Sequence, residues 1–461
     1  MNLCARVSTI FISLTLLTLP SVNAQELPAA ADSNSVDSAA HEKPLYRKIT
    51  LHGTASMEDG QIVKGQYGTR GQGVQEYERL WLSTNYLKLR TLVDVNDRLR
   101  IKGQIAGKLW FNTFPDSRIF DPTEIFVQNF DVYFDDAEGI IRILGGWQKP
   151  LLSLSTGTFP FKYNPDVRNL GEYMFRGAVS PGYLITAFDS PYATLSGFNL
   201  SSSVPVGKSF INQNILLTTE TQVYPFHDFT LSYLAGAEVG KFINCGAGIS
   251  FWHLISVNEN LTTPKTSANI MYVDSSNGSG KDTVYYTSRG IKVMGRVSLD
   301  PKVFLPFSRI FGKEDLKIYG EALVIGLKNY KEVYNNIWDR IPVTFGFNVP
   351  AFRILDVLAV EGEWYGNPYW DADKTLSQYG PLPKPDDPAG SYTPTINGFT
   401  YDNWKWSVYA KRTILGGLSL VGQAARDHMR MSEKYPKNYD FEAALEQNSH
   451  WWWVLKIQYD F

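Results

Sequence analysis

The sequence ends in WWWVLKIQYDF, residues 451–461, and the alternation in this stretch decides the fold class. One face of the stretch carries Trp451, Trp453, Leu455, Ile457, Tyr459 and Phe461, and the other carries Trp452, Val454, Lys456, Gln458 and Asp460. Successive side chains of a β-strand point to opposite faces, so the pattern predicts one long strand. Strands of soluble sandwiches usually have about 5–6 residues, whereas a tilted strand across a bilayer needs about 9–11. The length therefore favours a membrane strand.

The same alternation recurs upstream, for example in RLRIKGQI at 98–105. No stretch of 18 apolar residues follows Tyr46, which argues against membrane-spanning helices. Sixteen strands are predicted, with eighteen left open: 47–58, 79–92, 97–112, 123–135, 139–148, 193–204, 210–224, 227–239, 242–256, 285–299, 315–329, 341–349, 352–366, 401–414, 417–428 and 450–461. The sequence thus predicts an all-β fold, a transmembrane antiparallel β-barrel.

The connections between these strands alternate in length, which is an independent indication of a barrel. The odd-numbered connections are mostly long: 59–78, 113–122, 149–192, 225–226, 257–284, 330–340, 367–400 and 429–449. The even-numbered connections are mostly tight: 93–96, 136–138, 205–209, 240–241, 300–314, 350–351 and 415–416. Bacterial membrane barrels have short turns at one end and longer loops at the other, and an even number of strands.

The N-terminal residues have the pattern of a targeting segment. Arg6 is followed by an apolar run at 7–19 and by the small-residue ending Val22-Asn23-Ala24, which predicts a secretory signal peptide, residues 1–24, cleaved after Ala24. The alternative is a membrane anchor, but the run is shorter than a span of about 20 residues. Residues 25–45 are predicted to be a flexible lead, too short for a folded plug, and 46–461 the barrel.

Composition excludes several classes of function. The 44 basic and 46 acidic side chains give a net charge of -2, without the basic excess of a nucleic-acid binder. Aromatic residues make up 14% of the chain, which does not suit a disordered protein. The sequence contains no H-E-x-x-H or G-x-S-x-G, and its six histidines never pair at the spacing of helical metal ligands. We therefore expect no catalytic residues, no metal and no cofactor.

Together the N-terminal segment, the alternating connections and the terminal strand ending in Phe461 resemble a Gram-negative outer-membrane β-barrel of the porin type. The resemblance implies an outer-membrane location, contact with outer-membrane lipid, and recognition of Tyr459 and Phe461 as a signal by the barrel assembly machinery. A barrel of 16 to 18 strands leaves an aqueous channel. The resemblance thus implies a porin, a passive channel for small hydrophilic solutes, either monomeric or a homotrimer. No subfamily is matched.

The longest connection, 149–192, is a candidate constriction. Long ordered loops are usually functional, and porins fold their third outer loop into the lumen. The candidate constriction residues are Lys162, Asp166, Arg168, Glu172 and Arg176. The alternative is a surface lid, or a loop that packs against a neighbouring subunit.

Charged side chains on the strands should face the lumen, because a Lys or Arg facing lipid at mid-depth costs about 2–4 kcal/mol. The candidate pore-lining residues are Lys88, Arg90, Arg100, Lys102, Lys108, Lys292, Arg296, Glu321, Glu361 and Glu363. The strands 79–92 and 97–112 would form a basic wall, with the acidic residues well round the barrel. This predicts a modest anion preference. The alternative is that the charges only solvate the two rims.

Two further functions are left open. Aromatic residues in or beside 367–400 could form a sugar-stacking slide, although interface girdles also explain them: Tyr365, Tyr369, Trp370, Tyr401, Trp404 and Trp406. In the second, the long loops 257–284, 367–400 and 429–449 hold a polymer or a protein partner at the surface. The feature that discriminates is whether 149–192 obstructs the lumen partially or fully.

Overall fold

The computed structural model describes most of the predicted barrel. The described residues are 48–64, 66–67, 75–76, 81–113, 129–147, 149–175, 193–207, 209–219, 227–240, 242–257, 270–274, 282–285, 289–306, 308–328, 336–364, 404–414, 416–426 and 451–461. The predicted signal peptide and the lead at 25–45 lie outside them.

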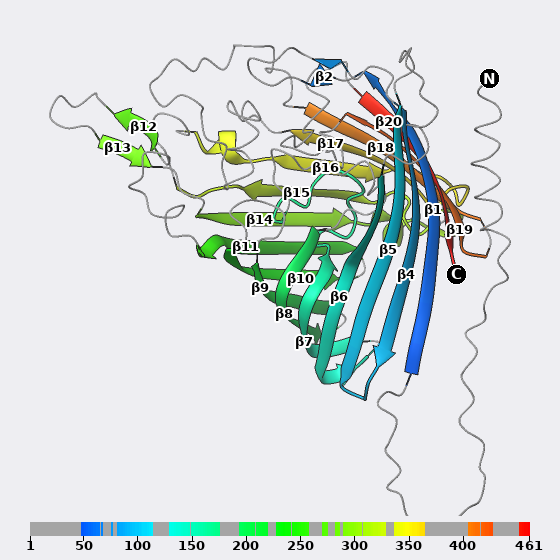
Figure 1. Cartoon of the computed structure of the whole chain (residues 1–461), viewed down its shortest axis with the longest axis horizontal. Coiled ribbons are helices and arrows are strands. Elements are labelled where there is room, and N and C mark those ends of the chain that lie inside the picture. Colours follow the sequence, from blue (N-terminus) through cyan, green and yellow to red (C-terminus); the bar gives the residue numbers. More distant parts are fainter. Residues whose placement is uncertain are drawn as a thin grey trace, which may run out of the picture.

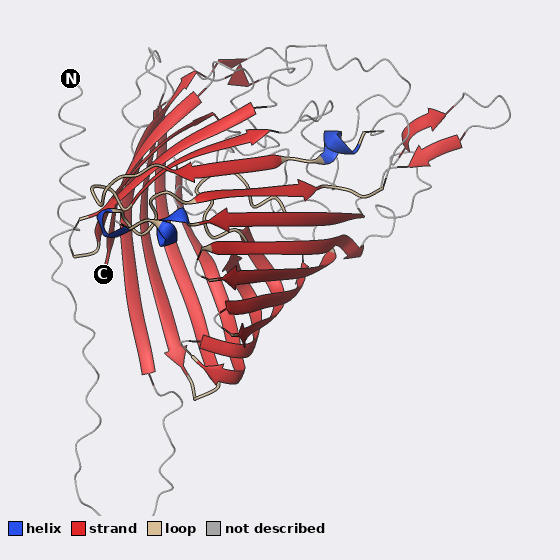
Figure 2. Cartoon of the chain, turned by 180° about the vertical axis from the view of Figure 1, so that it is seen from behind, coloured by secondary structure: helices blue, strands red, loops and turns tan. Residues whose placement is uncertain are grey.

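Sixteen antiparallel strands form one closed barrel (Figures 1 and 2), which confirms the predicted fold class and strand count. In chain order the strands are β1 (Lys48–Lys64), β4 (Trp81–Asp94), β5 (Leu99–Thr113), β6 (Asn129–Gly146), β7 (Lys149–Phe161), β8 (Ala193–Val206), β9 (Ser209–Thr219), β10 (Phe229–Val239), β11 (Ile243–Ile255), β14 (Gly290–Leu299), β15 (Ile318–Val324), β16 (Val343–Asn348), β17 (Val357–Trp364), β18 (Trp404–Thr413), β19 (Leu418–Arg426) and β20 (Trp451–Asp460). Each pairs with the next along the chain, and β20 pairs with β1.

Small elements occur in the connections. Two hairpins extend from long connections: β2 (Gln66–Tyr67) with β3 (Gln75–Glu76), and β12 (Ile270–Asp274) with β13 (Asp282–Tyr285). Three short 3-10 helices are η2 (Pro301–Phe304), η3 (Ser308–Ile310) and η4 (Ile337–Arg340). In the described part of the chain, no helix is long and apolar enough to cross a membrane.

The prediction was wrong at one place in the strand order. The predicted strands 123–135 and 139–148 are one continuous strand, β6, as far as it is described, and β7 occupies 149–161, which had been assigned to a long connection. Asp136 and Glu138 suggested a tight turn at 136–138, but they are buried strand residues opposite Gln104 and Lys102. One strand was predicted as two and one strand was missed, so the predicted count of sixteen still agrees with the structure.

The predicted alternation of the connections is confirmed. One end of the barrel, called the turn end, carries 95–98, 147–148, 207–208, 240–242, 300–317, 349–356 and 414–417. The other end, called the loop end, carries 65–80, 114–128, 162–192, 220–228, 256–289, 325–342, 365–403 and 427–450. The turn that had been predicted at 136–138 lies instead at 147–148, and the long connection after it begins at residue 162.

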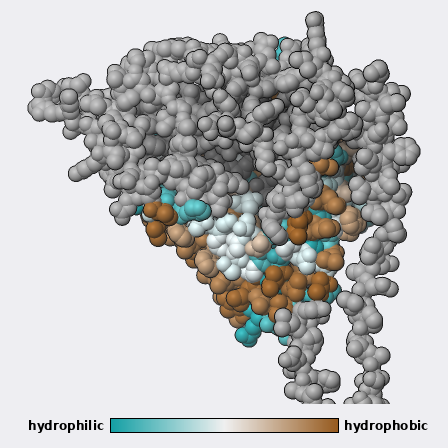
Figure 3. Space-filling model, in the orientation of Figure 1, coloured by the Kyte–Doolittle hydropathy of each residue, from teal (hydrophilic) through white to brown (hydrophobic). Residues whose placement is uncertain are grey.

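The outer face of the barrel is apolar and the inner face is largely polar. Leu455 and Ile457 of β20 are 58% and 47% exposed, whereas Lys456 between them is buried. The same arrangement occurs in β4, where the exposed Leu87 and Leu89 flank Lys88. Figure 3 shows hydrophobic residues along the described wall of the barrel and hydrophilic ones at its lower tip. A barrel made for water would have the opposite arrangement.

The barrel closes where its first and last strands pair, and Gly53 and Phe461 form the turn end of this seam. The Gly53 N–H donates to the Phe461 carbonyl (2.7 Å), and the Phe461 N–H donates to the Gly53 carbonyl (2.9 Å). The Phe461 ring lies over Gly53, because a Cβ at position 53 would come within 2.2 Å of two ring carbons. A residue with a Cβ therefore fits at position 53 only if the Phe461 ring moves.

The wall is uneven in height. The strands β4 to β8 have 14, 15, 18, 13 and 14 residues. The strands β15, β16 and β17 have only 7, 6 and 8 residues, and the two longest turn-end connections adjoin them: 300–317 leads into β15, and 349–356 joins β16 to β17. The side of the barrel with β15 to β17 is therefore a short wall.

Candidate functional site

The described part of the third loop-end connection, 162–175, lies inside the barrel and is called the lumenal loop. It leaves β7 after Phe161 and is drawn as the teal trace behind β6 in Figure 1. Val167, Leu170, Tyr173 and Met174 are each 0% exposed. A loop so deeply buried must satisfy its backbone groups inside the protein.

Glu361 of β17 holds the middle of the lumenal loop. Its carboxylate accepts hydrogen bonds from three successive backbone N–H groups, of Arg168 (2.5 Å), Asn169 (2.8 Å) and Leu170 (3.0 Å). The Tyr319 hydroxyl donates a fourth hydrogen bond (2.8 Å). Successive N–H groups that point to one anion form a binding concavity, and hydrogen bonds to a carboxylate are stronger than neutral ones. Glu361 thus fixes the loop against the wall.

Two more inward-facing glutamates hold the end of the same loop. Glu321 of β15 accepts hydrogen bonds from the Asn164 side-chain amide (2.8 Å) and from the Tyr173 N–H (3.1 Å). Glu363 of β17 accepts from the Tyr173 hydroxyl (2.7 Å) and from the Lys405 ammonium (2.8 Å).

These three glutamates were predicted to line the pore. They do point into the barrel, but the loop covers them, and Glu321, Glu361 and Glu363 are only 3%, 1% and 0% exposed. They serve as acceptors for the loop and do not face the open part of the lumen.

The lumenal loop also carries a buried carboxylate of its own. Glu172 accepts hydrogen bonds from the backbone N–H groups of Tyr163 (3.0 Å) and Asn164. The turn needs a left-handed backbone, with φ of +99° at Gly171 and +62° at Glu172. Burial, and next the negative charge of Glu321, raise the pKa of Glu172 to about 8. Glu172 therefore gains a proton near neutral pH.

Arg168 and Asp166 of the loop bind two charged residues at the turn end that the sequence did not reveal. Glu314 and Lys317, in the connection 300–317, form an ion pair (2.9 Å). Glu314 also binds the Arg168 guanidinium (3.1 Å), and Lys317 binds Asp166 (3.0 Å). Lys162 instead donates to a backbone carbonyl of the loop (2.8 Å).

Four of the five candidate constriction residues, Lys162, Asp166, Arg168 and Glu172, thus lie in the lumenal loop. The fifth, Arg176, lies outside the described residues. Burial, and next the Arg168 charge, lower the pKa of Lys162 to about 8.

The other flank of the loop is apolar and reaches across to the strands after β7. Tyr163, Tyr173 and Met174 belong to one buried cluster with Phe159, Leu195, Leu216, Leu234, Met294, Leu323 and Ile325. These partners come from β7, β8, β9, β10, β14 and β15 and from the residue just after β15. The loop is thus packed against wall residues on several sides.

Two basic residues predicted to line the pore contact the loop or its surroundings. The Lys292 ammonium donates to the Met174 carbonyl (3.4 Å) and lies 3.6 Å from the Trp252 ring centroid. The Arg296 guanidinium lies 4.8 Å from the Tyr163 ring centroid. Both side chains face inward, as predicted, and both help to hold the loop.

The predicted basic wall lies across the barrel from β15, whose Glu321 holds the lumenal loop. In the ring order β15 is seventh and β5 is fifteenth of sixteen, so they are eight places apart and diametrically opposed. Much of the basic charge is paired: Arg100 with Asp94 (3.1 Å) and Lys102 with Glu138 (2.8 Å). Sequence reasoning missed Glu138 because 138 was assigned to a turn, and missed Asp94 because 94 was placed just beyond a strand.

The remaining members of the basic wall differ in their surroundings. Arg90 is exposed and donates to the Gln104 side chain (3.1 Å); among the described residues no carboxylate pairs with it. Lys88 is half-buried, 5.5 Å from the Tyr86 ring centroid. Lys108 lies on β5, but its side chain lies outside the described set. Among the described side chains of this wall, Arg90 therefore carries the least compensated charge.

The aromatic residues considered for sugar stacking do not form a lumenal slide where they are described. Trp404 and Trp406 are 56% and 38% exposed and alternate with the buried Lys405, so they face outward. The other four, Tyr365, Tyr369, Trp370 and Tyr401, lie outside the described residues. Among the residues that are described, no group of three His, Cys, Asp or Glu side chains could hold a metal ion.

The two residues of the predicted assembly signal stack on each other. The ring centroids of Tyr459 and Phe461 are 5.9 Å apart, at the turn end of β20. Their role in assembly stays a prediction.

No protein-family model matches the chain, and no curated protein matches it significantly. Several solved structures are similar over 90% of this chain, all at low identity. They include OmpF of Salmonella typhi in complex with daunomycin (11% identity, 97% of that chain, TM-score 0.43) and a mutant of the Rhodopseudomonas blastica porin (9%, 100%, 0.39). OmpT, an outer membrane protein of Vibrio cholerae, is also similar (8%, 99%, 0.40). At these identities and TM-scores the similarity carries no functional argument. The argument for function rests on the residues of this chain.

Proposed function

We propose that the chain is an outer-membrane porin, a passive channel for small hydrophilic solutes. The apolar outer face, with residues such as Leu87, Leu89, Leu455 and Ile457 exposed, supports a position in lipid, because burial of apolar surface away from water is favourable. A closed barrel of sixteen strands is wide enough for an aqueous passage. Export with cleavage after Ala24, assembly through Tyr459 and Phe461, and a homotrimer belong to the same proposal.

The lumenal loop narrows this passage. The observation that carries the proposal is the Glu361 carboxylate, which receives the backbone N–H groups of Arg168, Asn169 and Leu170 deep inside the barrel. A loop held by its backbone keeps its position whatever solute passes, so it sets a fixed limit on solute size. The solute then moves between the lumenal loop and the facing wall of β4, β5 and β6.

A modest anion preference follows from the balance of charge on the two sides. The acidic residues beneath the loop are used as acceptors and are covered, as Glu361 illustrates. On the facing wall Arg100 and Lys102 are paired with carboxylates, but Arg90 is exposed and has no carboxylate partner among the described residues. A cationic side chain at the passage favours anions.

The test is single-channel conductance of the refolded protein in a planar bilayer, with the reversal potential measured under a salt gradient. We expect discrete steps and a reversal potential shifted toward that of anions. Arg90→Glu should reduce the shift, because it replaces an exposed positive charge on the facing wall by a negative one. Discrete steps with cation preference would keep the channel and refute the charge assignment. A correctly folded but silent barrel would refute the channel and favour the surface-binding function of the long loops.

A further inference from the structure

The turn end of the short wall carries an unusual row of exposed apolar side chains. Val303 (50% exposed), Phe304 (69%) and Ile310 (50%) lie in the connection 300–317, and Phe352 (54%) and Ile354 (73%) lie in 349–356. These five residues are called the turn-end ridge. The turn 95–98 between β4 and β5, by contrast, exposes Asn96 and Asp97. Grouped apolar side chains of this kind mark a contact surface.

The ridge is held in place by buried polar contacts and ring packing. The Asp315 carboxylate, 0% exposed, accepts hydrogen bonds from the N–H groups of Gly312 (2.8 Å) and Phe352 (3.1 Å) and so joins the two connections. The Phe352 ring stacks on Phe311 with centroids 5.7 Å apart. Phe304 packs against Phe242 of the neighbouring turn at 5.1 Å. The apolar side chains are thus presented by a built scaffold.

The strands that adjoin the ridge are the shortest of the barrel wall and leave little margin for spanning lipid. The seven residues of β15 rise about 23 Å along the strand and, at a tilt near 45°, cover about 16 Å of membrane depth. The outward apolar band of a membrane barrel is about 25 Å tall. The six residues of β16 leave a larger deficit. Backbone hydrogen bonds continue the β15–β16 ladder beyond these bounds, from the Leu316 N–H to the Asn348 carbonyl (2.9 Å) and from the Ile325 N–H to the Arg340 carbonyl (3.0 Å). Residues 316–325 then cover about 23 Å of depth, so this wall reaches the height of the band with little to spare.

The ridge continues the outward apolar surface of these same strands. Leu299 at the end of β14 and Ile318 at the start of β15 are 40% and 48% exposed, and they flank the connection 300–317. Phe347 of β16, 38% exposed, precedes 349–356 in the same way. The lumen side of the first connection is separate, because Glu314 and Lys317 there bind the lumenal loop. The ridge therefore extends the lipid-facing surface.

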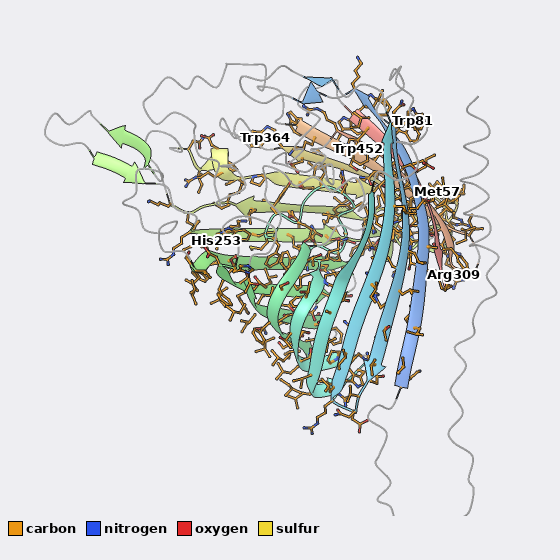
Figure 4. All side chains as sticks on the ribbon, viewed as in Figure 1. Met57, Trp81, His253, Arg309, Trp364 and Trp452 are labelled. Atoms are coloured by element: carbon orange, nitrogen blue, oxygen red, sulfur yellow. The ribbon has the colours of Figure 1, made fainter. Side chains whose placement is uncertain are left out.

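The free charges beside the ridge are basic. Arg309 and Lys313 are exposed, and in the described part of the chain no carboxylate lies within ion-pair distance of either. The acidic residues of the two connections are engaged: Asp300 with Lys302, Glu314 with Lys317, Asp315 with backbone N–H groups and Asp356 with Arg412. Figure 4 shows Arg309 at the end of the barrel opposite His253 and Trp364. An apolar row with a basic rim matches an acyl layer below anionic headgroups.

We propose that the turn-end ridge is inserted in the lipid leaflet at the turn end, with Phe304 and Ile354 among the acyl chains and Arg309 and Lys313 at the lipid phosphates. The inference rests on the proposed function, because it needs the barrel to span a bilayer. It assigns to 300–317 and 349–356 additional lipid contact at the turn end of the short wall.

The experiment places an environment-sensitive fluorophore on single cysteines of the full chain, refolded into vesicles of phosphatidylethanolamine and phosphatidylglycerol. Cys4 and Cys245 are first replaced by serine. Ile354→Cys and Phe304→Cys report the ridge. Leu87→Cys, on the outer face of β4, is the control in lipid, and Asp97→Cys, in the turn 95–98, is the control in water. Each is quenched with doxyl-labelled lipid and, separately, with iodide on both sides of the membrane.

We expect doxyl lipid to quench the two ridge labels about as strongly as the Leu87 label, and iodide to quench them several-fold less than the Asp97 label. In addition, Arg309→Glu with Lys313→Glu should reduce lipid quenching of the Ile354 label. If iodide reaches the ridge labels as it reaches Asp97 while the Leu87 label is quenched by lipid, the ridge proposal is wrong and the channel proposal stands. If the Leu87 label is not quenched by lipid in folded protein, the membrane barrel itself is refuted.

Discussion

Replacing Glu361 by alanine is expected to release the lumenal loop from the barrel wall. The change removes the acceptor of three backbone hydrogen bonds and one from Tyr319, and each hydrogen bond to a charged group contributes about 1.5–3 kcal/mol. These contributions are not additive, and water from the lumen can solvate the freed N–H groups. We therefore expect docking of the loop to weaken by about 3–5 kcal/mol, less than the sum, since each buried donor left unpaired costs about 1–3 kcal/mol.

A loss of about 3 kcal/mol changes the ratio of docked to undocked loop by about a hundredfold, since 1.4 kcal/mol is tenfold. In single-channel recordings, Glu361→Ala should show a larger and noisier open conductance than the wild type. Trypsin should then cleave the folded barrel after Lys162 or Arg168. Glu361→Gln should fall between the two, because its single amide oxygen can accept only some of these hydrogen bonds.

The matched control is Glu238→Ala, which removes an exposed carboxylate near the turn end of β10. Folding of every variant is checked by heat-dependent gel mobility. A folded Glu361→Ala barrel with unchanged conductance, unchanged noise and a trypsin-resistant loop would refute the claim that this carboxylate holds the loop.

Three further predictions concern pH, a buried ion pair and the closing seam. The pKa of Glu172 is raised from 4.5 to about 8 in the docked loop, so docking is strongest below pH 4.5 and weakens as the pH rises through about 8. Open-channel noise should therefore increase from pH 5 to pH 8. The same pH dependence in the Glu172→Gln variant would contradict this prediction. Lys405→Met leaves Glu363 buried without its cation and should lower the free energy of unfolding by about 3–5 kcal/mol, measured from the urea midpoint. The double variant Lys405→Met with Glu363→Gln should recover part of this stability. If it recovers none, the prediction is wrong. Gly53→Val would place side-chain atoms in the Phe461 ring and should lower the yield of folded barrel, whereas Gly103→Val, where a Cβ meets nothing within 4 Å, should not; equal yields would show that the seam tolerates the clash.

The alternation of side chains was enough to predict the barrel because burial in a barrel wall depends mainly on the face to which a residue points. β20 illustrates this, since its buried and exposed residues are those that the period of two assigns. The pattern failed at β7, where Leu152-Ser153-Leu154-Ser155 alternates but Pro150, Gly157 and Pro160 resemble strand breakers. It also overextended β15, because residues 315–317 belong to a turn in which Leu316 has a φ of +62°.

The candidate site was only partly predictable for a different reason. Alternation assigned Glu321, Glu361 and Glu363 to the inner face, and they do point inward. What covers them depends on the path of a loop from β7, more than 140 residues upstream, as the separation of 148 between Tyr173 and Glu321 illustrates. No local pattern carries that information. Glu314 was missed as well, since a polar residue in a connection carries no signal that it will meet Arg168.

The seam between β1 and β20 has a consequence for the order in which the protein acquires its shape. Residues 54 and 460 meet there, through a hydrogen bond from the Thr54 hydroxyl to the Asp460 carboxylate (2.7 Å), at a sequence separation of 406. Pairing across such a distance is slow, since the chain entropy is lost before the contacts form. Until the final residues arrive, β1 and β19 each present an unpaired edge to any other strand nearby, and such edges promote aggregation. Nascent copies therefore need to be kept apart for as long as the ring is open.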